Sequence, residues 1–113
     1  QTLLSVMFSE GVAKGRISVE RLVEVLAGNP ARLFGLPAKG TITVGRDADL
    51  VIWNPSARRV LRQADLQHTS DFTPYEGLEV SGAPEHVLSA GRPVGERTGR
   101  FIERARPSLA DGN

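Results

Sequence analysis

The first 36 residues carry apolar side chains at the three- and four-residue spacing that is typical of amphipathic helices. Residues 3–8 predict one helix, which is closed by Gly15. Residues 18–26 predict a second helix that Gly28 stops. Its N-cap is Ser18, and its single apolar stripe comprises Val19, Leu22, Val23 and Leu26.

A short third helix is predicted over residues 29–34, because Asn29 can cap a helix and Pro30 suits a first helical turn. After Lys39 the apolar spacing changes to two residues, which is typical of β-strands. Helices therefore precede strands, and this order predicts an α+β chain with two layers or two domains rather than a βαβ repeat. The predicted strands are 41–44, 49–53, 58–62, 78–81, 85–90 and 93–94.

Turn residues predict how the first strands connect. Gly45-Arg46-Asp47 predicts a tight turn that joins residues 41–44 and 49–53 as a hairpin, and Asn54-Pro55 predicts the end of the second strand. Trp53 ends the continuous apolar run of that strand, so we expect it to be largely buried.

Composition excludes several classes of protein. The chain has 113 residues, with 14 Lys+Arg against 13 Asp+Glu, so we expect no basic surface for nucleic acid. It has no cysteine, which excludes disulfides and thiolate metal sites and favours the cytosol. No apolar run approaches 18 residues, so we expect no membrane-spanning helix.

The two histidines are the first candidates for chemistry. His68 and Asp71 lie three residues apart, but a His-based metal site needs more ligands than this chain offers, so a polar loop between strands is the favoured interpretation. His86 lies between apolar residues of a predicted strand, where a partly buried structural histidine is favoured.

Two carboxylate pairs are the next candidates. Asp47 and Asp49 flank a predicted turn, where aspartate commonly bonds local backbone, so a structural role is favoured. Glu76 and Glu79 follow Tyr75 and could suggest a glycosidase pair, but with one Trp and one Tyr the chain lacks the rest of a sugar site. A loop that buttresses neighbouring structure is favoured there, and we assign no catalytic, substrate-binding or metal-binding residue.

Glycine and serine motifs add no active site. Residues 91–100 are glycine-spaced and basic, but they contain no Gly-Lys-Ser/Thr and are therefore not a phosphate loop. Turn chemistry explains these glycines. No serine lies in a Gly-x-Ser-x-Gly frame, so a nucleophile elbow is absent.

Five segments of the chain carry a family resemblance: 11–18 (GVAKGRIS), 29–36 (NPARLFGL), 40–53 (GTITVGRDADLVIW), 68–82 (HTSDFTPYEGLEVSG) and 99–102 (GRFI). Together they resemble the C-terminal portion of D-hydantoinases and dihydropyrimidinases, the cyclic-amide branch of the amidohydrolase superfamily. The resemblance covers residues 1 to about 104. The interval 95–98 is shorter than the corresponding excursion in the family.

The resemblance implies an architecture. Residues 1–36 would be the last helices of a TIM-like (β/α)8 barrel, residues 37–104 the C-terminal part of a small β-sandwich, and residues 105–113 a mobile tail. In this family the sandwich is completed by strands from the N-terminal part of the chain. The first residue is Gln1 and not Met, and the apolar spacing predicts that the chain begins inside a helix, so we expect the chain to be a segment of a longer protein.

The resemblance also implies an activity for that longer protein. It would hydrolyse the ring C–N bond of hydantoins or dihydropyrimidines at a site with two divalent metals, zinc above all, and a carboxylated lysine. All those ligands would precede Gln1, so the segment itself would be structural and inactive alone. Its partners would be the rest of its own chain and further subunits in a dimer or tetramer, without nucleic acid or membrane, in the cytoplasm.

Other functions stay open at this point. The parent could be a non-catalytic dihydropyrimidinase-like interaction protein, or another amidohydrolase such as an allantoinase or a dihydroorotase. The 113 residues could also form a stand-alone binding domain. An enzyme would need a His-x-His strand and the metal-bridging lysine upstream, whereas a stand-alone domain would need a complete sandwich of its own.

Overall fold

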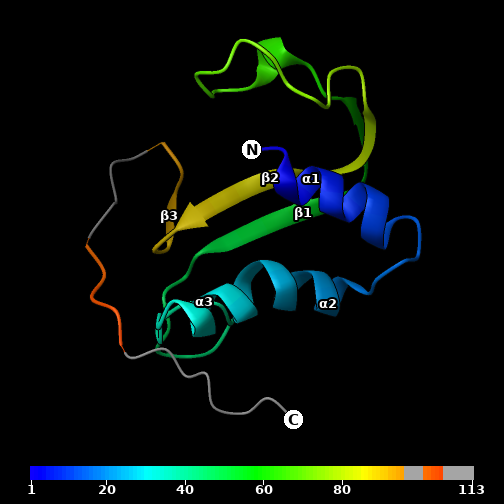
Figure 1. The fold of residues 1–113 in the computed structure, drawn as a ribbon. Coiled ribbons are helices and arrows are strands. Elements are labelled where there is room, and N and C mark those ends of the chain that lie inside the picture. The colour runs from blue at the N-terminus through cyan, green and yellow to red at the C-terminus, as the bar shows by residue number, and fades with distance from the viewer. Residues whose placement is uncertain (96–100, 106–113) are drawn as a thin grey trace. The chain divides into compact units, whose positions relative to one another are not determined.

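The computed structural model describes residues 1–95 and 101–105 (Figure 1). The interval 96–98, the first half of the segment 99–102 and most of the predicted tail 105–113 lie outside the described residues.

Helices occupy the first part of the chain, as the apolar spacing predicts. Helix α1 (Leu3–Met7) continues into the π-helical turn η1 (Phe8–Val12), and α2 (Val19–Val23) continues into η2 (Glu24–Gly28). Helix α3 (Asn29–Leu33) follows η2 directly, because Gly28 has helical angles (φ −62°, ψ −52°). The three predicted helices are confirmed, but the prediction that Gly28 stops the second one is wrong.

The two predicted caps have different outcomes. The Ser18 Oγ accepts a hydrogen bond from the Arg21 N–H at 3.1 Å, so Ser18 caps α2 as predicted. Asn29 is not a cap, because the backbone is already helical when it reaches this residue. Its side-chain oxygen accepts a hydrogen bond from the Arg32 guanidinium instead.

Helix α2 carries Val19, Leu22 and Val23 at the spacing that places them on one side of a helix, as predicted. Leu22 is 2% exposed, whereas Val19 and Val23 are 48% and 54% exposed. The described residues therefore cover only part of this apolar stripe and leave the rest in contact with solvent.

Three strands form one sheet in the order β1-β2-β3 (Figure 1). Strand β1 is Leu50–Val60, β2 is Glu79–Ser89 and β3 is Arg92–Pro93. Strands β2 and β3 pair antiparallel, with Leu88 opposite Pro93. A 3₁₀ turn, η3 (Gln63–Asp65), lies in the long connection between β1 and β2.

The predicted hairpin between residues 41–44 and 49–53 is absent, so that prediction is wrong. No strand forms at 41–44, and β1 pairs with β2 instead. The chain from 38 to 47 closes on itself as a loop: the Asp47 N–H donates to the Ala38 carbonyl at 3.0 Å, and the Arg46 N–H donates to the Thr43 carbonyl at 3.1 Å. These local bonds hold the segment away from strand pairing.

Two pairs of predicted strands are single strands. Segments 49–53 and 58–62 merge into β1 across Pro55, and segments 78–81 and 85–90 merge into β2 across Pro84. Proline is tolerated in β1 because β1 is an edge strand. The Ser56 N–H donates to the Asn54 side chain at 3.0 Å, which satisfies a backbone donor next to that proline.

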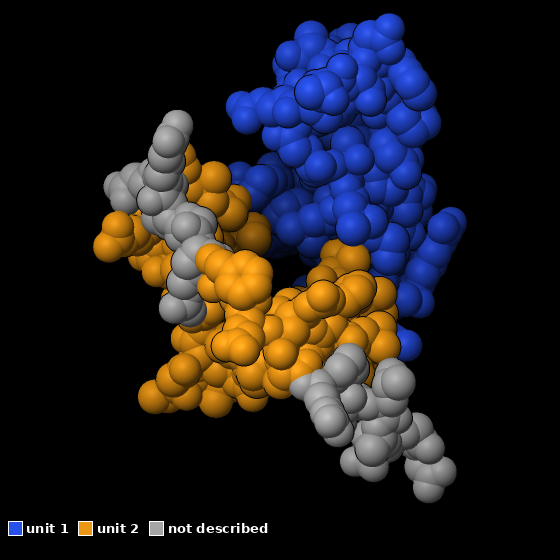
Figure 2. Space-filling view, turned by 60° about the vertical axis from the view of Figure 1, so that its left-hand side comes forward, with its two compact units in different colours: residues 1–22, 53–85 blue, residues 23–52, 86–113 orange. Residues whose placement is uncertain are grey.

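The chain forms two compact units, each built from segments that are distant in sequence (Figure 2). The first unit comprises residues 1–22 and 53–85, and the second comprises 23–52 and 86–113. The sequence-based division at 36/37 and 104/105 concerns domains of a larger parent and stays a prediction.

A helix packed on strands forms the core of the first unit. Phe8 is 7% exposed, and its ring lies 5.2 Å from that of Trp53 at an interplanar angle of 57°. The backbone of Gly82 (φ +86°) closes this contact, because a Cβ there would lie 2.6 Å from Trp53 Nε1 and 2.7 Å from Phe8 Cδ1. Trp53 is only partly buried, which corrects the expectation of a largely buried residue, although its Nε1 atom is itself shielded from solvent.

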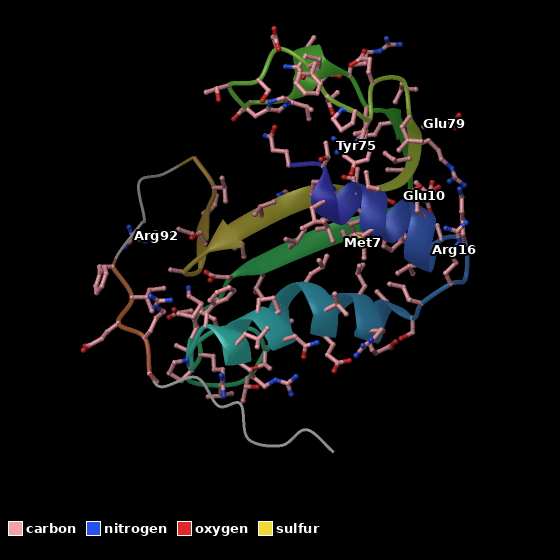
Figure 3. The ribbon with its side chains drawn as sticks, in the orientation of Figure 1. Met7, Glu10, Arg16, Tyr75, Glu79 and Arg92 are labelled. Atoms are coloured by element: carbon pink, nitrogen blue, oxygen red, sulfur yellow. The ribbon has the colours of Figure 1, made fainter. Side chains whose placement is uncertain are left out.

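Two buried serines attach the same helix to the strands. The Ser5 Oγ accepts a hydrogen bond from Arg59 at 2.8 Å, and the Ser9 Oγ accepts one from the Ser81 N–H at 3.0 Å. Both serines lie on the buried side of α1 and η1, where hydrophobic spacing gives no indication of them. Figure 3 shows the side chains of this helix, with Met7 and Glu10 labelled.

Candidate functional site

His68 and Asp71 lie in a polar loop between strands, which is the interpretation that the sequence favours. His68 and Asp71 are both exposed in the connection between β1 and β2. Across residues 1–95 and 101–105, no group of three or more His, Cys, Asp or Glu side chains is placed to hold a metal ion. The metal pair that the resemblance implies therefore does not fit the residues present here.

His86 lies in β2 and is exposed, so the prediction of a partly buried strand histidine is wrong. The alternation of side chains between two faces along residues 85–90 correctly predicts a strand, but it does not predict how far the side chains are buried. In the second half of β2 the described residues cover neither face fully, and Val87 is itself 38% exposed.

Of the glutamate pair, Glu76 belongs to the connection between β1 and β2, which is ordered by hydrogen bonds. The Glu76 carboxylate accepts the Gln63 N–H at 2.6 Å, and the Gln63 side-chain amide donates to the Ser70 carbonyl at 2.5 Å. The backbone closes the base of the loop, where the Leu61 N–H donates to the Leu78 carbonyl at 2.9 Å.

Glu76 therefore has a structural contact, in agreement with a buttressing loop. Tyr75 lies in this loop, and Glu79 lies exposed at the start of β2 (Figure 3). An acid–base pair needs two carboxylates that share a substrate position, whereas here one of the two is committed to a backbone amide.

The most connected group of charges lies in the second unit and centres on Lys39. Its ammonium forms an ion pair with Asp47 at 2.9 Å and a further, shorter one with Asp49. The Lys39 and Asp47 side chains are 19% and 16% exposed, and that of Asp49 is 42% exposed. Sequence reasoning identified both aspartates but missed the lysine, since no motif spacing links residues 39 and 49.

Asp49 also binds backbone at a distant position. Asp49 Oδ1 accepts the Ala90 N–H at 2.8 Å, and the adjacent Gly91 N–H donates to the Ala48 carbonyl at 2.9 Å. A structural role for Asp49 is thus correct, but the amide that it binds lies 41 residues away rather than in its own turn. Through these bonds the loop 38–49 is attached to the turn between β2 and β3.

The charges in this cluster compensate one another. The hydrogen bond from Lys39, followed by the one from the Ala90 N–H, lowers the pKa of Asp49. The pKa of Lys39 is raised by its hydrogen bond to Asp49 and, next in size, by its hydrogen bond to Asp47. Both groups are therefore held in their charged forms at neutral pH, which suits a structural ion pair and not proton transfer.

The remaining motifs also give turns rather than chemistry. Gly91 has φ +79° at the turn into β3 and Gly95 has φ +123°, in agreement with the turn interpretation of the glycine-spaced segment. The other glycine of that segment, Gly99, lies outside the described residues. None of the helices in the described part of the chain has the length and apolarity that a membrane crossing requires.

Comparisons with known proteins give a consistent result. Residues 2–94 match the family model described as "Amidohydrolase family". The chain is 49% identical over 93 residues to a D-hydantoinase of Geobacillus stearothermophilus, which covers 80% of this chain and 20% of the relative. It is 43% identical over 109 residues to a D-hydantoinase of Ralstonia pickettii, which covers 88% of this chain and 24% of the relative.

The fold comparison agrees with the sequence comparison. The crystal structure of a dihydropyrimidinase from Brevibacillus agri superimposes with a TM-score of 0.77 at 41% identity, over 80% of this chain and 20% of that one. The chain thus spans about a fifth to a quarter of the length of the relatives that it matches.

Proposed function

Because the chain belongs to the amidohydrolase family, we propose that it is the C-terminal segment of a hydrolase that opens the C–N bond of a cyclic amide, a hydantoin or a dihydropyrimidine. The observation that carries this proposal is the similarity to hydantoinases, at 43–49% identity over 80–88% of the chain. The similarity to a dihydropyrimidinase structure supports the same substrate class.

The segment's own role in this proposal is structural. Lys39 is engaged in ion pairs and Glu76 in a bond to a backbone amide. Among the described residues, no group of three or more His, Cys, Asp or Glu side chains could hold a metal ion. The helices would pack against a catalytic barrel, and the strands would form part of a β-sandwich. The partly exposed stripe of α2 that includes Val19 and Val23 supports this, since the apolar stripe of an amphipathic helix normally faces a core.

The metals belong to the proposal for the whole enzyme. Two divalent ions, zinc above all, would polarise the scissile carbonyl and supply a hydroxide when bound. Their ligands and the carboxylated lysine would come from other parts of the parent, and no step of the reaction is assigned to residues 1–113. A cytoplasmic dimer or tetramer completes the proposal, and a chain without cysteine suits a reducing compartment.

The test is a ring-opening assay on the complete protein that contains this chain. Hydantoin and dihydrouracil are supplied separately, and formation of the carbamoyl amino acid is measured before and after metal removal and zinc restoration. We expect zinc-dependent hydrolysis of at least one substrate, and none by residues 1–113 alone. Allantoin and dihydroorotate are supplied as alternative substrates, and hydrolysis of either of these alone would give a different substrate class. Inactivity with all four compounds after zinc loading would favour a non-catalytic relative.

A further inference from the structure

A short segment near the C-terminus lies against the end of α3, within the second unit. The Ala105 N–H donates a hydrogen bond to the Gly35 carbonyl at 2.8 Å, although the two residues are 70 positions apart. Gly35 is buried and has φ +65°, directly after the last turn of α3. The end of this helix is therefore in contact with backbone from the opposite end of the chain.

The contact admits only glycine at position 35. A Cβ on Gly35 would lie 2.0 Å from the Ala105 carbonyl oxygen and 3.0 Å from its carbonyl carbon. Both atoms are backbone, so no rotamer change can relieve the overlap. By contrast, Gly15 has a similar φ of +68° and ends the first helical segment, but a Cβ there would meet nothing within 4 Å. The left-handed conformation explains glycine at both positions, whereas the approach of Ala105 applies only to Gly35.

We propose that Gly35 is a docking site for the chain's own segment 101–105, which we name the strap. The strap is held there through its backbone. Phe101 is 94% exposed and Ala105 is exposed as well, and Ile102 is the one side chain of the strap that is partly buried. One backbone hydrogen bond changes the equilibrium between the attached and the released strap by about fivefold. The strap is thus a releasable latch at the end of α3, and this inference does not depend on the proposed enzymatic activity.

The experiment measures the distance between α3 and the strap. The chain contains no cysteine, so spin labels can be placed at two sites only, through Arg32→Cys and Glu103→Cys, in the full 113-residue chain. The labelled chain is diluted with an excess of unlabelled chain, so that distances between copies do not contribute. Pulsed electron paramagnetic resonance then gives the distance distribution. We compare the labelled parent with Gly35→Ala, with Ala105→Pro, which removes the donating N–H, and with the matched control Gly15→Ala.

We expect a short-distance population in the parent and in Gly15→Ala. That population should fall about fivefold relative to the longer distances in Ala105→Pro and be lost in Gly35→Ala. An unchanged distribution in Ala105→Pro would overturn the latch, and so would equal broadening in Gly35→Ala and Gly15→Ala, which would assign the effect to backbone strain. If Gly35→Ala does not fold, Ala105→Pro decides alone.

Discussion

The two units of the chain are held together by different physical means. The first unit contains four of the five buried hydrophobic residues of the described part of the chain, namely Phe8, Leu22, Leu61 and Val80. The second contains only Ala31. Close packing in this unit occurs at glycines, as at Gly40, where a Cβ would lie 2.6 Å from the Ala31 Cβ. Ion pairs around Lys39 and backbone bonds supply the other contacts there.

The exposed apolar side chains show the same difference in reverse. Among the described residues, five large hydrophobic side chains are exposed in the first unit and ten in the second, among which Ile42 and Val44 are 89% and 102% exposed. The first unit therefore resembles the interior of a small domain, whereas no large apolar side chain that the structure describes in the second unit is fully buried. This difference is what the proposed function predicts, in which further chain of the parent would cover the second unit.

The largest effect should come from Gly82→Ala in the first unit. The added Cβ would overlap Trp53 and Phe8, and the residue would keep a left-handed conformation. We expect a loss of about 2–5 kcal/mol in the free energy of unfolding, since overpacking and strain add. Urea denaturation measures it.

The matched control for this change is Gly77→Ala. Gly77 has φ +78°, but a Cβ there would meet nothing within 4 Å, so only the strain of about 1–2 kcal/mol remains. Equal losses in the two variants would show that the contact of Phe8 and Trp53 with Gly82 is not what holds the first unit.

A smaller effect is expected from Lys39→Met in the second unit. Removing the ammonium leaves Asp47, with a side chain 16% exposed, without its ion pair. We expect a loss of about 1–2 kcal/mol at pH 7, below the value for a fully buried pair because Asp49 is well exposed. Urea denaturation at pH 7 gives the value, and Lys14→Met, whose ion pair with Glu10 is an exposed helical one, serves as control.

The same ion pairs predict a pH dependence with two limbs. The lowered pKa of Asp49 stabilises the fold above the ordinary value of 3.8, and this stability is lost as the pH falls below it. The raised pKa of Lys39 stabilises the fold below 10.5, and this stability is lost as the pH rises through the higher folded-state value. The difference between the parent and Lys39→Met should therefore be constant from about pH 5 to pH 10 and shrink outside that range. A difference that peaks at one pH would contradict the assignment.

The smallest effect on stability should come from the exposed loop residues. Ile42→Ser with Val44→Thr should change the free energy of unfolding by less than about 0.5 kcal/mol, because both side chains are already in solvent. Their effect should appear in self-association instead, since exposed apolar groups promote it. A large loss of stability would mean that the second unit has a core that includes them.

Local sequence patterns predicted the helices well because helical spacing and caps such as Ser18 are local properties. They failed where a distant segment decides the outcome. Residues 41–44 have the alternation of a strand, but they lie in a loop that the bond from the Asp47 N–H to the Ala38 carbonyl closes. They pair with none of the strands β1 to β3. The strands continue through Pro55 and Pro84 because their pairing is set by the sheet rather than by local propensity.

The candidate site could be predicted only in part for the same reason. A turn aspartate was a sound prediction for Asp49, but neither Lys39 nor Ala90 could be identified as its partner, since both contacts require the folded loop. The buried serines Ser5 and Ser9 were missed because their partners, Arg59 and the Ser81 N–H, lie on strands more than 50 residues away.

The central claim is that this chain's exposed apolar residues are normally covered by the rest of a larger hydrolase. Size-exclusion chromatography with light scattering on the 113-residue chain tests it most directly, over a hundredfold range of concentration. We predict a mass that exceeds one chain and rises with concentration, and that falls toward one chain in Ile42→Ser with Val44→Thr. A monomer at every concentration that unfolds cooperatively would contradict the account, because it would show that residues 1–113 are a self-sufficient domain.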